Sequence, residues 1–221
     1  MKQSEKSMLP RSNIKYEEQL LEEGYHLIAG IDEVGRGPLI GPVVAACVIL
    51  KEHEFLEGVT DSKKLSEKKR EQYYEIIMEN AVSVGIGIIS PATIDEVNIY
   101  QATILAMKET VKNCKIKPDY ILVDGNMKID FEIPSKSIVK GDQLSLTIAA
   151  ASIIAKVTRD RMLIELDGQY PMYGFKNHKG YPTKQHLEAI QKYGLIEGYR
   201  KSFKPVQEIM IQDEKNCITN Q

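Results

Sequence analysis

The feature that most limits the fold of this chain is a short glycine-rich segment between two strand-like segments. Tyr25–Asp32 precedes it and the Val- and Ile-rich segment 42–50 (PVVAACVIL) follows it, and both are typical of β-strands. Gly35 and Gly37 let the backbone turn sharply between them. Because strands joined by so short a turn pair antiparallel, we predict that the fold begins with a β-hairpin.

Strand and helix patterns alternate along the rest of the chain. Strands are predicted over 81–90, 119–125 and 136–142, and helices near Glu67–Asn80, from Ser90 to about Val111, over 143–167, near Lys184–Tyr193 and at the C-terminus. Ser66 is the expected N-cap of the first helix, and Ser90-Pro91 marks the start of the second. Strand–helix–strand units imply parallel pairing. The sequence therefore predicts an α/β fold with a mixed sheet and helices on its faces.

Length and composition indicate one globular domain. The chain has 221 residues, of which 43% are hydrophobic and 27% charged, and its net charge is -2. We expect the polar residues 1–24 to form an N-terminal extension outside the main fold, with a helix around Tyr16–Glu23, and residues 25–221 to form the domain. The chain has no apolar segment long enough for a membrane span, no apolar core of a signal peptide and no paired spacing of its three cysteines. We therefore expect a cytoplasmic protein with no membrane partner.

The glycine segment resembles a dinucleotide-binding fingerprint but lacks its context. In that fingerprint a helix follows the glycines directly, because the helix N-terminus binds the pyrophosphate. Here Pro42 begins a β-branched segment, and two acids, Asp32 and Glu33, come immediately before the glycines rather than about 20 residues after them. The sequence also lacks the G-K-[ST] of a P-loop. A nucleotide-binding dehydrogenase is therefore disfavoured.

Carboxylates stand at the ends of three predicted strands. They are Asp32 with Glu33, Asp124 and Asp142. Taken singly, each acid could cap a turn or helix or pair with a lysine. Strand ends converge in α/β sheets, however, and several carboxylates at one edge would repel each other unless cations lay among them.

The residue types predict which cation would bind. Mg²⁺ or Mn²⁺ suits carboxylate ligands, and the histidines and cysteines show no zinc spacing. Two such ions about 4 Å apart catalyse in-line displacement at a phosphodiester. Side chains alternate along a strand, so Asp32 and Glu33 can approach one ion only where the strand ends. The glycines that follow relax the backbone there.

Six motifs together resemble one known family. They are GIDEVGRGPLIGPVVAA, DSKKLS, VDG, VKGDQLS, AAASIIAKVTRDR and HKGYPTKQH, and they run in this order from about Ala29 to Val206. The set is similar to bacterial type 2 ribonuclease H (ribonuclease HII). The resemblance implies a ribonuclease H-like fold, with a mixed five-stranded sheet flanked by helices and further C-terminal helices. It makes residues 25–221 the catalytic domain.

The resemblance also implies an activity and a metal site. The family cleaves the RNA strand of RNA–DNA hybrids and nicks duplex DNA on the 5′ side of an embedded ribonucleotide, leaving a 3′-hydroxyl and a 5′-phosphate. Its four acids correspond to Asp32, Glu33, Asp124 and Asp142, which implies a two-ion Mn²⁺ or Mg²⁺ site completed by Asp142 when substrate is bound. We expect the enzyme to act as a monomer on RNA–DNA hybrids and junction duplexes.

Substrate contacts are implied in the same way. The backbone of Gly35, Arg36 and Gly37 would contact the ribose 2′-hydroxyl, the group that separates RNA from DNA. Tyr181 would stack beneath the next sugar; the alternative is an ordinary surface tyrosine beside Pro182. Candidate phosphate contacts, which could equally be a solvated helix or loop surface, are Ser62, Lys63, Lys64, Lys156 and Arg159.

Two related alternatives stay open at this point. The sister family, ribonuclease HIII, usually carries a larger N-terminal substrate-binding domain than 24 residues allow, and its loop differs from the G-R-G pattern. A non-catalytic nucleic-acid binder on the same fold would have no need to keep all four acids. Both are less consistent with the sequence than the hydrolase.

Overall fold

The computed structural model describes residues 14–51, 56 and 65–219. Its strands are β1 (Ile28–Val34), β2 (Val43–Ile49), β3 (Ser83–Ile89), β4 (Tyr120–Asp124) and β5 (Ser135–Ile138). Its helices are α1 (Lys15–Glu22), α2 (Glu67–Asn80), α3 (Pro91–Asn113), α4 (Gly141–Leu144), α5 (Leu146–Gln169), the 3-10 turn η3 (Pro171–Tyr173), α6 (Phe175–His178), α7 (Lys184–Tyr193) and α8 (Lys204–Thr219).

The five strands form one mixed sheet in the order β3-β2-β1-β4-β5. Strand β1 pairs antiparallel with β2 and parallel with β4. The hairpin and the mixed sheet predicted from the sequence are therefore confirmed. The central strand β1 carries Asp32 and Glu33 close to its carboxyl end.

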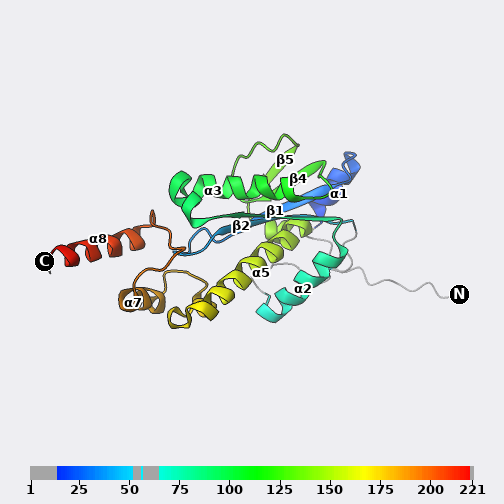
Figure 1. Cartoon of the computed structure of the whole chain (residues 1–221). Coiled ribbons are helices and arrows are strands. Elements are labelled where there is room, and N and C mark those ends of the chain that lie inside the picture. The colour runs from blue at the N-terminus through cyan, green and yellow to red at the C-terminus, as the bar shows by residue number, and fades with distance from the viewer. Residues whose placement is uncertain (1–13, 52–55, 57–64, 220–221) are drawn as a thin grey trace.

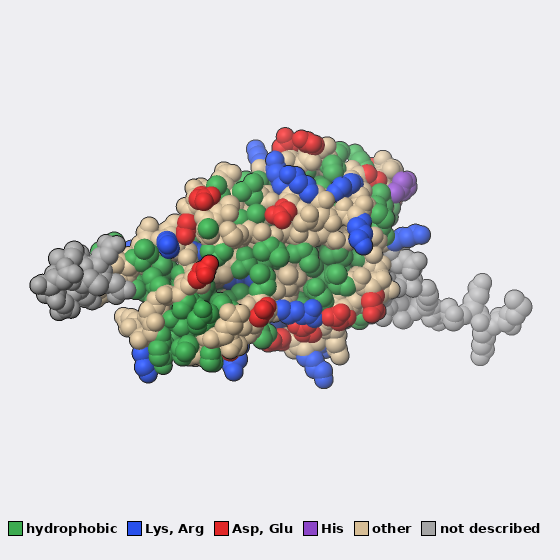
Figure 2. All heavy atoms as spheres, viewed as in Figure 1, with side chains coloured by type: hydrophobic (Ala, Val, Ile, Leu, Met, Phe, Trp, Pro, Cys, Tyr) green, Lys and Arg blue, Asp and Glu red, His purple; other side chains and the backbone are tan. Residues whose placement is uncertain are grey.

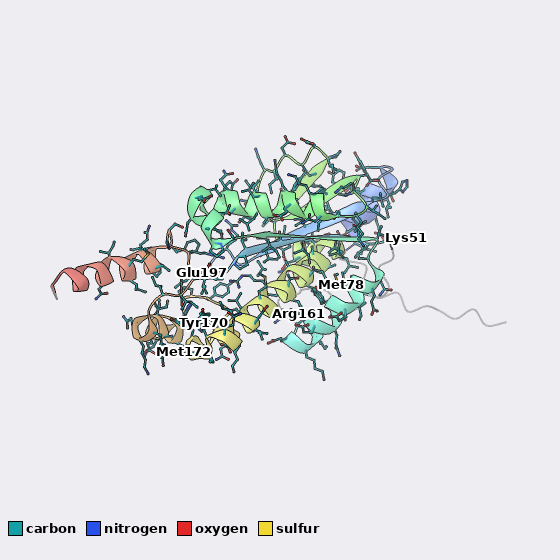
Figure 3. All side chains as sticks on the ribbon, viewed as in Figure 1. Lys51, Met78, Arg161, Tyr170, Met172 and Glu197 are labelled. Atoms are coloured by element: carbon teal, nitrogen blue, oxygen red, sulfur yellow. The ribbon has the colours of Figure 1, made fainter. Side chains whose placement is uncertain are left out.

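Helices cover both faces of the sheet. Helix α3 lies on one face, and α5 and α2 lie on the other (Figure 1). Arg161 joins the two lower helices, because it reaches from α5 towards α2 and donates to Glu71 and Glu75 (Figure 3). Ser66 and Ser90 cap α2 and α3 as predicted, accepting hydrogen bonds from backbone N–H groups three residues on.

One glycine sets how closely α5 approaches the sheet. A Cβ on Gly30 would lie 2.1 Å from the carbonyl carbon of Thr147 and 2.2 Å from the nitrogen of Ile148. The first turn of α5 therefore rests directly on the backbone of β1. This contact is two residues from Asp32, so the same packing places the helix beside the acids.

The last strand is shorter than predicted, and the predicted long helix is interrupted. Strand β5 ends at Ile138, so Asp142 lies not at a strand end but in α4, the short turn that follows. Lys140 takes a left-handed conformation (φ 57°) and starts α4, and Ser145 takes an extended one (φ -136°) that separates α4 from α5. The predicted helix over 143–167 is therefore two helices.

The helix predicted around Tyr16–Glu23 is present as α1. Leu20 is buried with Ile28, Leu122, Ile138 and Ile148, which come from β1, β4, β5 and α5. Residues 1–24 were predicted to lie outside the main fold. The described part of this segment, α1, instead packs against the sheet through Leu20.

The chain after α5 forms a second packed group at one end of the molecule (Figure 1). Tyr173 and Phe175 stack with ring centroids 5.2 Å apart, and Tyr199 packs with them in the same cluster. Tyr199 also bridges to Ile40, which ties this group to the segment after the glycine turn.

The described residues contain no helix that is long and apolar enough to cross a bilayer. On the face shown in Figure 2, acidic and basic side chains are interspersed around a band of hydrophobic ones. The charged side chains on that face therefore form no large patch of one sign.

Candidate active site

Three of the four predicted acids come together at the carboxyl ends of two parallel strands. In the pairing of β1 with β4, Ile31 lies opposite Val123. Asp32 and Asp124 are the next residue on each strand, so the register places them side by side on the same face of the sheet. Glu33 follows Asp32 where β1 leaves the parallel pairing.

The pKa values report the closeness of these carboxylates. Burial raises the pKa of Asp32 well above its usual value, and the charges of Glu33 and Asp124 raise it further. Burial and Asp124 also raise the pKa of Glu33, while the Arg36 guanidinium, 3.5 Å from its carboxylate, opposes the change. Negative charge is therefore concentrated at one point of the sheet edge.

Backbone donors orient two of the acids. The N–H of Glu33 donates to Oδ1 of Asp32 at 2.7 Å, and the N–H of Gly141 donates to Oδ1 of Asp124 at 2.6 Å. The second bond brings α4 to the end of β4, and Asp142 is the residue after Gly141. Asp142 is 1% exposed. It thus lies next to the cluster through the backbone of α4.

The donor set fits a hard divalent cation, while the described side chains are not closed around one. Carboxylates that raise each other's pKa are stabilised by a cation among them, and oxygen ligands suit Mg²⁺ or Mn²⁺. Within residues 14–51, 56 and 65–212, however, no three His, Cys, Asp or Glu side chains converge as a complete ligand set. The charge and chemistry of a metal site are present, and its final ligand geometry is not.

A buried arginine that was not predicted from the sequence binds the backbone of the glycine loop from the protein interior. Arg200 is fully buried, and its guanidinium donates to the carbonyl oxygens of Gly35 at 2.6 Å, Arg36 at 3.1 Å and Gly41 at 2.8 Å. Gly35 has a positive φ of 93°, which a residue with a side chain rarely adopts. The backbone of the loop is therefore fixed by an interaction that ends on its carbonyl groups.

Arg159 occupies a different place from that expected of a phosphate contact. It is fully buried and donates to the carbonyl oxygens of Ile40, Pro42 and Lys179. Burial lowers its pKa to about 10 and that of Arg200 to about 9, so both stay cationic at neutral pH. In this structure Arg159 supports the loop from inside and does not present its guanidinium to a ligand at the surface.

Tyr181 lies against the glycine loop. The residue is 41% exposed, and its Cε1 atom would be 3.3 Å from a Cβ placed on Gly37. The backbone carbonyl of Tyr181 accepts a hydrogen bond at 2.9 Å from Nδ1 of the buried His186. Gly37 and Tyr181, distant in sequence, thus form one surface with an open aromatic face.

The remaining predicted residues are divided between the surface and the undescribed part of the chain. Lys156 is partly exposed and pairs with Asp160 at 2.6 Å. Ser62, Lys63 and Lys64 lie outside the described residues.

Comparison with known proteins identifies the family. A model of ribonuclease HII matches residues 29–206. The chain is 58% identical over 196 residues to the ribonuclease HII of Bacillus mycoides (strain KBAB4), covering 89% of this chain and 76% of that protein. It is 57% identical over 196 residues to that of Bacillus cytotoxicus, covering 89% and 75%.

The chain belongs to the ribonuclease HII family. Membership supports a hydrolase with endoribonuclease activity on RNA–DNA hybrids, in a family that depends on divalent metal. It also removes the dehydrogenase alternative. The predicted cytoplasmic location and monomeric state remain predictions.

Solved structures confirm the predicted ribonuclease H-like fold. The ribonuclease H2 of Pyrococcus horikoshii OT3 superimposes with a TM-score of 0.74 at 28% identity, covering 85% of this chain and 99% of that one. The ribonuclease HII of Archaeoglobus fulgidus, solved with PCNA, gives 0.70 at 29% identity, covering 80% and 95%. A Bst ribonuclease HIII solved with Mn²⁺ gives 0.66 at 20% identity, covering 86% and 70%, a likeness of fold alone.

Proposed function

We propose that this ribonuclease HII hydrolyses the RNA strand of hybrids and nicks duplex DNA on the 5′ side of an embedded ribonucleotide, using two divalent ions. The observation that supports this best is the placement of Asp32 and Asp124 at equivalent register positions of adjacent parallel strands. Such a concentration of buried negative charge is unfavourable without a counter-ion, because the carboxylates raise each other's pKa values.

We propose that Asp32, Glu33 and Asp124 hold the ions, with Asp142 added when substrate is bound. These residues would hold Mn²⁺ or Mg²⁺, and the chemistry supplied by the bound ions would be activation of a water and stabilisation of the leaving oxygen of a phosphodiester. The protein contributes the positions of its carboxylates. The N–H groups of Glu33 and Gly141 orient two of them, and the packing of α5 on Gly30 keeps β1 in place. Breaking the bond between the phosphorus and the 3′-oxygen would leave a 3′-hydroxyl and a 5′-phosphate.

The loop Gly35–Arg36–Gly37 is the proposed sensor of the ribose. The buried guanidinium of Arg200 donates to the carbonyl oxygens of Gly35 and Arg36, so these two oxygens point into the protein. Because a trans peptide points its N–H opposite to its C=O, the N–H groups of Arg36 and Gly37 face the other way. Two backbone donors on one side of a loop suit an oxygen ligand such as a 2′-hydroxyl.

Tyr181 is the proposed platform for the sugar that follows. Its exposed ring lies beside Gly37, so a nucleotide bound by the loop would have its neighbour over the aromatic face. Stacking on an aromatic ring is tolerant of base identity. Together the loop and the tyrosine would read a junction between RNA and DNA rather than a sequence.

A nicking assay tests the proposed function. The substrate is a DNA duplex with one embedded ribonucleotide, incubated with Mg²⁺, with Mn²⁺ and with EDTA, beside an all-DNA duplex of the same sequence. We expect cleavage on the 5′ side of the ribonucleotide with either ion, and labelled ends that carry a 3′-hydroxyl and a 5′-phosphate. Cleavage in EDTA, or equal cleavage of the all-DNA duplex, would contradict the proposal.

A further inference from the structure

The N-terminal helix places a buried carboxylate at the start of α5. Glu17 is 1% exposed and accepts hydrogen bonds from the hydroxyls of Ser145 at 2.7 Å and Thr147 at 2.9 Å, and from the N–H of Thr147 at 3.1 Å. The first N–H groups of a helix have no partner within the helix, and the positive end of its dipole favours an anion. Glu17 supplies both an acceptor and a negative charge there.

The residues that Glu17 holds form the junction beside the acids. Ser145 ends α4 with its N–H on the carbonyl of Gly141 at 2.8 Å, and it caps α5 with its hydroxyl, which accepts from the N–H of Ile148. Gly141 in turn donates to Asp124 at 2.6 Å. A continuous series of hydrogen bonds therefore leads from Glu17 through Ser145 and Gly141 to Asp124, and Asp142 lies within the turn that this series fixes.

Apolar packing keeps α1 in this position. Leu20, one turn after Glu17, is buried with Ile148 of α5 and Ile138 of β5. Lys136 of β5 also lies over the Tyr16 ring, 4.9 Å from its centroid. Helix α1 thus contacts the elements on both sides of α4, the strand before it and the helix after it.

From these contacts we propose that Glu17 is a positioning residue for the acidic site, through which the N-terminal helix sets the place of α4 and Asp142. This role rests on the proposed function, because it assumes that Asp124 and Asp142 act in hydrolysis. It assigns to the segment before the family's motifs a part in the activity that no motif in the sequence indicates.

The test compares three variants of the full chain. Glu17→Ala removes all three acceptor interactions, whereas Glu17→Gln keeps a carbonyl oxygen that can accept from the two hydroxyls. Glu22→Gln removes a charge from the exposed side of the same helix and is the matched control. Each is measured for kcat and KM on an RNA–DNA hybrid at saturating Mg²⁺, and for amide hydrogen exchange of residues 141–148 without substrate.

We expect Glu17→Ala to lower kcat about tenfold, the lower end of the loss for a direct outer partner of a metal ligand, because Glu17 acts on Asp124 through Ser145 and Gly141. KM should change little, and exchange at 141–148 should be faster. Glu17→Gln should recover most of the kcat, and Glu22→Gln should match the wild type in both measurements. A folded Glu17→Ala protein with wild-type kcat would overturn the proposal, because the carboxylate would then stabilise the fold without positioning the site.

Two further outcomes are also decisive. If Glu17→Ala does not fold, Ser145→Ala takes its place, since it removes the hydroxyl that joins Glu17 to this series and keeps the carboxylate; a wild-type kcat and wild-type exchange in that variant would overturn the proposal. If the wild-type protein fails to cleave the hybrid, the proposed function fails, while the exchange data still show whether Glu17 fixes α4.

Discussion

Asp32 and Asp124 lie side by side because each is one residue beyond a paired position, Ile31 on β1 and Val123 on β4. In a parallel pair, side chains at equivalent positions point to the same face of the sheet. A shift of one residue in this register would send one of the two carboxylates to the other face. The site therefore depends on the packing that fixes the two strands as much as on the acids themselves.

Gly30 is predicted to be essential to that packing. Gly30→Ala would place a methyl group 2.1 Å from the backbone of Thr147, and overpacking against a backbone costs about 1–3 kcal/mol or more. Gly168→Ala is the control, because a Cβ there meets nothing within 4 Å and alanine favours the helix by up to about 1 kcal/mol. Denaturant unfolding should show the first variant less stable and the second equal or more stable. Equal stability of Gly30→Ala and wild type would mean that α5 is not packed on β1 as described.

Tyr181 is predicted to contribute selectivity for the RNA–DNA junction. Tyr181→Ala removes the ring beside Gly37, and loss of one stacking contact of about 1–3 kcal/mol corresponds to a loss of kcat/KM of about 5- to 150-fold on a duplex with one ribonucleotide. Tyr181→Phe keeps the ring and should keep the preference. The measurement is the ratio of kcat/KM on the junction duplex to that on a continuous hybrid. An unchanged ratio in Tyr181→Ala would leave the residue as an ordinary surface tyrosine.

Arg200 is predicted to control the use of the ribose by the glycine loop. Lysine cannot reproduce the guanidinium fork that reaches the carbonyls of Gly35, Arg36 and Gly41. We expect Arg200→Lys to lower kcat/KM on a ribonucleotide-containing duplex by about tenfold or more, the equivalent of one charged hydrogen bond of about 1.5–3 kcal/mol. Affinity for an all-DNA duplex should change little. Arg161→Lys, at the exposed pair with Glu71 and Glu75, is the control and should behave as wild type.

The protein is predicted to lose stability in mild acid through His186, the buried histidine that donates to the Tyr181 carbonyl. Burial lowers the pKa of His186 from 6.5 to about 4. Between these values the unfolded chain binds a proton that the folded protein does not, so the free energy of unfolding falls by about 2–3 kcal/mol as the pH is lowered through this interval.

His186→Gln should flatten that part of the profile, because glutamine can still bond to the Tyr181 carbonyl and the Tyr199 hydroxyl without titrating. His26→Gln, at an exposed position, should leave the profile unchanged. Denaturant unfolding from pH 7 to pH 4 measures both. A wild-type slope in His186→Gln would show that another group is responsible.

The parts of the structure that depend on local pattern could be predicted from the sequence. The β-hairpin follows from two β-rich segments joined at Gly35 and Gly37, and the helix starts at Ser66 and Ser90 follow from capping. The nearness of Asp32 and Asp124 required one further step, that strand ends converge in an α/β sheet. These inferences use residue type and spacing alone.

The supporting contacts could not be predicted, because they join distant segments without a periodic pattern. Arg200 and Arg159 end on backbone carbonyls, which any residue provides, so nothing in the loop sequence indicates an arginine partner. Glu17 lies in a helix rich in acids, and only the packing shows which acid is buried. Asp142 was wrongly predicted at a strand end. The chain turns into α4 at a left-handed position that is occupied by Lys140 and not by a glycine, so the residue type there does not indicate a turn.

The central claim is that the carboxylates at the ends of β1 and β4 act together in hydrolysis. The most direct measurement is the rate at which Asp124→Asn cleaves an RNA–DNA hybrid at saturating Mg²⁺ and Mn²⁺, with Asp130→Asn as an exposed control on the following loop. The account predicts a loss of more than about 100-fold for Asp124→Asn, greater than that for an outer partner of a ligand, with hybrid binding retained and with Asp130→Asn unchanged. A rate for Asp124→Asn close to that of the wild type would contradict it.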